Sequence, residues 1–241
     1  MRARERGAAA AGAKRAAGPL GTSRSSDGAG RRRALERLLA AAAVAWLAAV
    51  ALIEVVGADP APLDVASSPD ALVAGDAWRL LSSALIVDSG LPLLQVAVTA
   101  AVTAAVLVRH GAIVWWLAAL AGHVCSTLIA YALIGGGITL GFASADRVAD
   151  DWDFGISCVL AAEAGVLFAG GLRRLRGRRG DAGDVALVVA TSLGLLATFT
   201  TIDWYGVEHP LAFALGAWTL VAYERRARRL LGQRPMPSAS R

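Results

Sequence analysis

The chain contains few cysteines, few aromatic residues and few charges for its 241 residues. Two cysteines occur, aromatic residues make up 6% of the sequence and charged residues 18%, whereas an average soluble domain is about 25% charged. Two cysteines exclude a disulfide scaffold, and neither stands in a CxxC-type metal-binding spacing. This composition argues against both a disordered chain and an ordinary soluble enzyme.

Hydrophobic residues are abundant instead, at 56% of the sequence, and the mean hydropathy is +0.54. They gather in long runs that are rich in Ala and Leu and show no period-two alternation, which predicts helices rather than strands. The first three runs are long enough for a membrane-spanning helix, which needs roughly 20 residues. We therefore predict an all-α, polytopic membrane protein with six transmembrane helices in one bundle, at residues 34–56, 84–108, 112–135, 155–171, 184–202 and 207–223.

The two ends of the chain differ from this apolar part. Residues 1–33 are rich in Ala, Gly, Ser and Arg, and such a segment cannot bury a core, so we predict a disordered basic tail. Residues 34–224 form the predicted membrane domain and residues 225–241 a second basic tail. A signal peptide is a poor alternative, because the first apolar run exceeds the apolar region of about 7–15 residues that such peptides have.

The basic residues predict how the chain lies in the membrane. With six spans, every Lys and Arg except Arg79 and Arg147 falls on the side that carries both termini. An excess of Lys and Arg marks the cytoplasmic side, so we expect a multi-pass plasma-membrane protein with both termini in the cytoplasm. The formal net charge of +5 then faces anionic membrane lipids. Residues 1–33 hold no aromatic residue to stack on bases, so we expect no nucleic-acid partner.

A serine and a histidine stand near the outer ends of two predicted spans that run in the same direction. Ser157 begins the fourth span and His209 begins the sixth, so both are expected at a similar shallow depth. They could form a pair in which the hydroxyl is the nucleophile and the imidazole the base. Gly155 and the free N–H groups of the helix start could hold an oxyanion. The alternative is a serine at a helix N-terminus and an unrelated interfacial histidine.

The sequence around these residues resembles the rhomboid family of intramembrane proteases. Gly155-Ile156-Ser157 is similar to the family's GxS motif, and positions 157 and 209 have a similar separation of 52 residues. His209 is followed by small residues three and seven positions on, as in the family, and Trp78-Arg79 resembles a pair in its first outer loop. The resemblance implies a six-helix bundle in which Ser157 and His209 cleave single-span membrane protein clients.

Two features depart from the family pattern. Rhomboid proteases carry a His and an Asn early in the second span that stabilise the oxyanion, whereas residues 89–96 contain neither. Gln95 is the only side-chain amide nearby, and in a peptidase it would hold the oxyanion together with the N–H groups near Ser157. Cys158 replaces the glycine that follows the serine. A catalytically inactive rhomboid-like protein that binds client transmembrane helices is therefore an equally open hypothesis.

Two further polar residues are expected near the membrane midplane. His123 in the third span and Glu163 in the fourth could pair, or each could find separate partners. If they lined a proton or solute path, the chain would be a small channel or transporter, although no inverted repeat supports this. We predict that Cys125 and Cys158 are small packing residues, and that the glycines at 135–137 end the third span. No metal site or cofactor is predicted.

Overall fold

The computed structural model describes residues 23–56, 65–87, 89–198 and 206–232. The chain divides into two compact units, residues 1–35 and residues 36–241. In the first unit the described residues are helical: α1 (Ser23–Val56) begins at Ser23, inside the segment for which we expect disorder. The other residues of the two predicted tails, 1–22 and 233–241, lie outside the described residues.

The described residues form helices and no strand, and one isolated bridge joins Ser67 to Asp153. This confirms the predicted all-α class. Four helical segments are long and apolar enough to cross a membrane, namely Gly30–Val56, Pro92–His110, Ala112–Thr139 and Ile156–Arg176. After α1 the helices are α3 (Pro69–Val73), α4 (Arg79–Ser82), η1 (Ser83–Leu85), α5 (Pro92–His110), α6 (Ala112–Leu120), η2 (Ala121–Cys125), α7 (Ser126–Thr139), α8 (Ala143–Asp146), α9 (Ile156–Arg176), α10 (Ala182–Thr198) and α11 (Glu208–Gly232).

Two helix boundaries differ from the sequence prediction. The second long helix does not begin at residue 84, because residues 83–85 form a short 3-10 turn and α5 begins at Pro92, where a proline is favoured in the first helical turn. The glycines at 135–137 do not end the third span, since α7 continues to Thr139. Gly141 follows with a φ of 80°, a left-handed conformation that suits glycine just after a helix.

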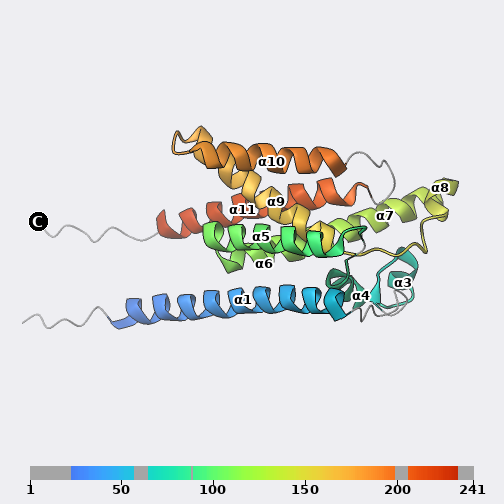
Figure 1. Ribbon diagram of the computed structural model, residues 1–241, viewed down its shortest axis with the longest axis horizontal. Coiled ribbons are helices and arrows are strands. Elements are labelled where there is room, and N and C mark those ends of the chain that lie inside the picture. The colour runs from blue at the N-terminus through green and yellow to red at the C-terminus, as the bar shows by residue number, and fades with distance from the viewer. Residues whose placement is uncertain (1–22, 57–64, 88, 199–205, 233–241) are drawn as a thin grey trace, which may run out of the picture. The chain divides into compact units, whose positions relative to one another are not determined.

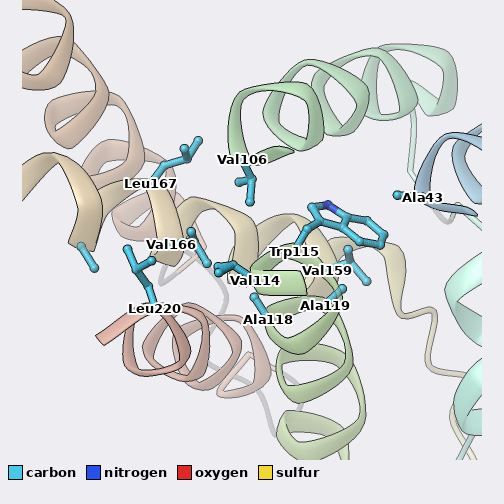
Figure 2. Packing of buried hydrophobic residues seen from close by; sticks show 11 residues of the cluster. Ala43, Val106, Val114, Trp115, Ala118, Ala119, Val159, Val166, Leu167 and Leu220 are labelled. Atoms are coloured by element: carbon cyan, nitrogen blue, oxygen red, sulfur yellow. The ribbon is translucent and has the colours of Figure 1, made fainter. Parts of the chain in front are cut away.

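Helix α9 is the centre of the second unit. It packs against α5, α6, α10 and α11, which run alongside it in Figure 1. Val166 of α9 meets Val114 and Trp115 of α6 and Leu220 of α11 in the main apolar cluster (Figure 2). The ring of Trp115 also lies 5.7 Å, centroid to centroid, from that of Trp46 in α1. Residues 156–172 of α9 are buried or half-buried, which explains why this stretch is apolar apart from Ser157 and Glu163.

Helices α9 and α11 approach each other at two glycines. A Cβ added to Gly165 of α9 would overlap the carbonyl of Phe213, and one added to Gly216 of α11 would overlap the carbonyl of Ala162. Only a residue without a side chain allows the two backbones to come this close. Gly216, singled out because of the rhomboid resemblance, therefore has a packing role in the structure.

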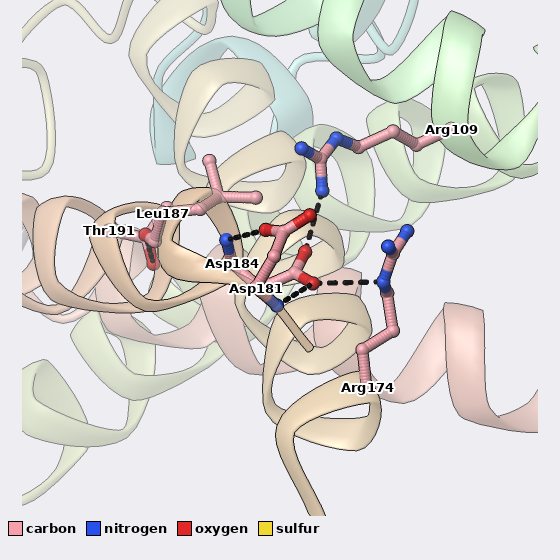
Figure 3. Close-up of polar contacts among 6 residues, drawn as sticks. All are labelled: Arg109, Arg174, Asp181, Asp184, Leu187 and Thr191. Carbon is pink, nitrogen blue, oxygen red and sulfur yellow. Dashed lines mark hydrogen bonds and ion pairs between the residues drawn. The ribbon is translucent and has the colours of Figure 1, made fainter. Parts of the chain in front are cut away.

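The turns between α5 and α6 and between α9 and α10 lie at one end of the bundle, opposite α3, α4 and α8 (Figure 1). At this end Arg109 of α5 and Arg174 of α9 both pair with Asp184 of α10, at 2.9 Å each. Asp184 is fully buried and its N–H is capped by Asp181 Oδ1 at 2.9 Å (Figure 3). We call this the arginine end. One carboxylate thus links three helices.

Candidate functional site

The start of α9 is fixed by contacts from distant parts of the chain. Asp153 exchanges two backbone hydrogen bonds with Ser67, at 2.8 and 3.2 Å, and its Oδ2 accepts a hydrogen bond from Tyr131 at 3.2 Å. The Tyr131 hydroxyl also lies 2.5 Å from Ser67 Oγ. Gly155 N–H donates to Ser83 O at 3.1 Å. These contacts hold the segment before Ser157 in one position.

Ser157 and His209 line the same cavity, which has a volume of about 420 Å³. Helices α5, α9, α10 and α11 form its walls. Apart from these two residues the lining is apolar except for Thr191, whose hydroxyl donates to Leu187 O at 2.8 Å. The other lining residues are Val98, Val102, Leu160, Ala161, Ala164, Leu167, Leu187, Ala190, Gly194, Leu195 and Phe213.

The two side chains share a cavity without a hydrogen bond between them in the described part of the chain. Ser157 Oγ donates instead to Phe154 O, at a long 3.5 Å. Cys158, which follows Ser157, and Glu208, which precedes His209, contact each other: Cys158 Sγ lies 3.5 Å from Glu208 Oε2. Both cysteines are free, with Cys158 buried and Cys125 exposed.

The residues considered for an oxyanion site have other contacts. Gly155 N–H is already bonded to Ser83 O, and its Cα lies directly against the ring of His123. Gln95 is not among the residues that line the cavity of Ser157. Its backbone carbonyl accepts a hydrogen bond from Thr99 at 2.9 Å within α5. No polar donor faces Ser157 from these two positions in this conformation.

His123 packs under the start of α9. It lies in η2, a π-helical turn between α6 and α7, and its Nε2 is 3.4 Å from Ser83 Oγ. Such turns add a residue to a helix and re-aim its side chains. Here the turn places Gly122 against Ala162 and the His123 ring against Gly155, where a Cβ would overlap the ring. His123 therefore packs against the residue just before α9, the helix that carries Ser157.

Glu163 has partners of its own and does not pair with His123. It is fully buried, and its Oε1 accepts hydrogen bonds from Thr103 Oγ1 and Trp115 Nε1, both at 2.5 Å. The two donors come from α5 and α6. Glu163 thus joins three helices through one oxygen. The sequence left open whether His123 and Glu163 pair or have separate partners, and in the structure they have separate partners.

Sequence reasoning missed the carboxyl group beside this site. Asp153 is buried, and burial raises its pKa to about 6, although the hydrogen bond from Tyr131 opposes the shift. Glu208, next to His209, lies close enough for the charge of Asp153 to act on it. The signal was present, because Asp153 stands two residues before Gly155 and Glu208 directly before His209. However, no local sequence pattern shows that Asp153 and Glu208 come close to each other.

These observations define the class of the protein: a helical protein with four helices suited to a membrane and one largely apolar cavity that holds a serine and a histidine. Among the described residues no group of three or more His, Cys, Asp or Glu side chains could hold a metal ion. No protein-family model, curated protein or solved structure matches the chain.

Proposed function

We propose that the protein is a rhomboid-like membrane protein that binds the transmembrane helix of a single-span client, with client side chains entering the cavity lined by Ser157 and His209. The observation that carries the proposal is the largely apolar lining of that cavity on four helices. In this proposal α10 and α11 complete six spans and both termini lie in the cytoplasm. The positive-inside distribution of Lys and Arg supports that orientation.

The residue types of the lining favour a helix as the ligand. Ala161 and Ala164 on α9 and Ala190 and Gly194 on α10 present small side chains to the cavity. In lipid, small residues let helix backbones approach closely and so stabilise helix pairs through packing. An apolar helix needs no polar partner there, which agrees with the engaged hydroxyl of Thr191.

Site-specific photocross-linking in cells tests this proposal. A photoreactive residue at Ala161, inside the cavity, should cross-link single-span proteins, whereas the same residue at the exposed Ala214 of α11 should not capture the same set. Adding Ala164→Leu should reduce capture from position 161 by about tenfold, because the added carbons occupy the cavity. Identical partners from positions 161 and 214 would contradict the proposal. A melting curve of Ala164→Leu confirms that the variant is folded.

The second candidate function is a serine peptidase, favoured by the fact that two residues 52 positions apart, 157 and 209, line one cavity. Ser157 would have to leave Phe154 O and turn toward the imidazole. A missing oxyanion donor costs about 10²–10³ in rate, so only slow acylation is expected.

A fluorophosphonate probe separates the two candidates. The peptidase predicts labelling of the detergent-solubilised protein that Ser157→Ala and His209→Ala both abolish. Client binding predicts that Ser157→Ala still captures the same partners from position 161. Equal labelling of the parent protein and Ser157→Ala would show that Ser157 is not the nucleophile.

A further inference from the structure

A second cavity, of about 730 Å³, opens at the arginine end, on the other side of the bundle from Ser157. Its charged and titratable lining residues come from the end of α5, the end of α9 with the following turn, and α11. They are Arg109, His110, Arg173, Arg174, Arg179 and Glu224.

The cavity retains positive charge after its ion pairs are counted. Arg109 and Arg174 share the single carboxylate of Asp184, and Arg173 shares Glu224 with Arg228, which does not line the cavity. The lining thus contains four arginines and only two carboxylates lie near them: Glu224, which lines the cavity, and Asp184, which does not. The surplus is concentrated in a concave site.

The turn after α9 brings Arg179 to this cavity. Gly177 N–H donates to Arg173 O at 2.9 Å, and Arg179 N–H donates to Arg174 O at 3.0 Å, so the chain folds back on the helix end. Arg178 between them has a φ of 55° and does not line the cavity. Of these two adjacent arginines, Arg179 lines the cavity and Arg178 does not.

Guanidinium groups are the side chains best suited to phosphate, because their planar N–H groups match its oxygens. Arg173 follows Ser157 by 16 residues, or about 24 Å of helix, close to the thickness of the hydrocarbon core of about 30 Å. Given the proposed orientation, the cavity lies at the level of the cytoplasmic headgroups. Val108, which also lines it, is 87% exposed and offers an apolar surface beside the charges.

We propose that this cavity binds a phosphate-bearing anion, with the headgroup of an anionic phospholipid as the expected source and a free phosphate as the other. Basic pockets between helices on the cytoplasmic side bind such headgroups in other membrane proteins. The binding function is independent of client binding and of peptidase activity, since it uses neither Ser157 nor His209.

Binding of phosphatidylglycerol to the full-length protein in detergent, followed by native mass spectrometry, tests the proposal, with phosphatidylcholine as the reference lipid. Arg179→Gln should weaken phosphatidylglycerol binding about three- to fivefold, the range of one partly exposed ion pair. Arg178→Gln removes the same charge from the same turn and should leave binding unchanged. Equal effects of the two variants, or equal binding of the two lipids with no response to inorganic phosphate, would overturn the proposal.

Glu224→Gln should strengthen binding of the phosphate-bearing ligand, whereas Arg179→Gln should weaken it. Removing this carboxylate releases Arg173 and takes a negative charge out of the lining, so the affinity should rise by a similar factor, which misfolding does not explain. A titration with inorganic phosphate identifies the source. If Arg179→Gln weakens phosphate binding but not lipid binding, the site takes a soluble phosphate. Unchanged or weaker binding of both ligands by Glu224→Gln would contradict the proposed role of the charge.

Discussion

Glu163 shows how a carboxyl group is accommodated inside an apolar bundle. One of its oxygens accepts hydrogen bonds from a threonine of α5 and a tryptophan of α6. A buried polar group that keeps its partner costs little, whereas one that loses it costs the full desolvation penalty. The donors, rather than a charge, therefore explain why this residue is tolerated. His123 is accommodated differently, because its ring packs against Gly155 and only one hydroxyl, that of Ser83, lies near its Nε2.

Two substitutions at Glu163 should separate the role of its oxygen as an acceptor from the role of its charge. Glu163→Gln keeps an oxygen acceptor for Thr103 and Trp115 but puts an amide N–H group where Oε2 has no partner, so it should cost less than Glu163→Leu. Glu163→Leu leaves Thr103 and Trp115 without their acceptor and should cost about 1–3 kcal/mol. Unfolding in mixed detergent measures both. A large loss in Glu163→Gln would indicate that the negative charge itself is required.

Asp153 should make stability depend on pH. Its pKa is raised to about 6, so between about pH 4 and 6 the folded state binds more protons than the unfolded state. Stability from this group is therefore present at low pH and is lost as the pH rises through that window. The loss is on the order of 2–3 kcal/mol, since one pKa unit corresponds to about 1.4 kcal/mol.

Melting curves of the parent protein and Asp153→Asn at pH values from 4 to 7 check this expectation. The parent should melt at higher temperature near pH 4 than near pH 7, and the variant should show a flatter dependence. Glu208 contributes to the same charge balance, so Glu208→Gln is measured in parallel. Identical slopes for the parent and Asp153→Asn would assign the pH dependence to other groups.

Helices α9 and α11 behave as one packed element because Gly165 and Gly216 bring their backbones together. Gly216→Val should lower the free energy of unfolding by about 1–3 kcal/mol, the usual range for overpacking a tight site. The reason is that the new side chain would overlap the carbonyl of Ala162. Ala214→Val adds a β-branched residue on the exposed face of the same helix and should cost less than about 1 kcal/mol. Equal losses would mean that helix propensity, and not packing, sets the cost.

The apolar runs predicted the long helices because a membrane-spanning helix is apolar along its whole length. The start of α5 at Pro92 and the π-helical turn around His123 were missed, since local pattern does not reveal them. The partners at the candidate site were missed for the same reason. Ser83 lies 40 positions from His123, and only the fold brings it to the His123 ring and to Gly155.

Charge is segregated between the two ends of the bundle. Arg109 and the arginines of the α9–α10 turn lie at one end, and aspartates such as Asp70 and Asp150, together with Arg79, line a cavity at the other. With anionic lipid and positive-inside insertion, this difference favours one orientation. It also places the two cavities on opposite sides of the membrane in the proposed topology.

Labelling of introduced cysteines in intact cells measures the orientation. In a chain whose Cys125 and Cys158 are replaced by alanine, Ser144→Cys in α8 should react with a membrane-impermeable maleimide. Arg178→Cys should react only after the cells are opened. The reverse pattern would invert the proposed topology, and labelling of both positions in intact cells would contradict a membrane-spanning bundle.

Glu36 near the start of the first apolar run has a consequence for assembly. Its Oε2 accepts the backbone N–H of Ala112 at 2.8 Å, 76 positions later, and so caps the first turn of α6. Gly111, with a φ of 87°, allows the carboxylate to come close. A ribosome makes α1 long before it makes α6, so this carboxylate has no such partner until residue 112 has been synthesised. Helix α1 therefore completes this contact only after synthesis of the third long apolar segment has begun.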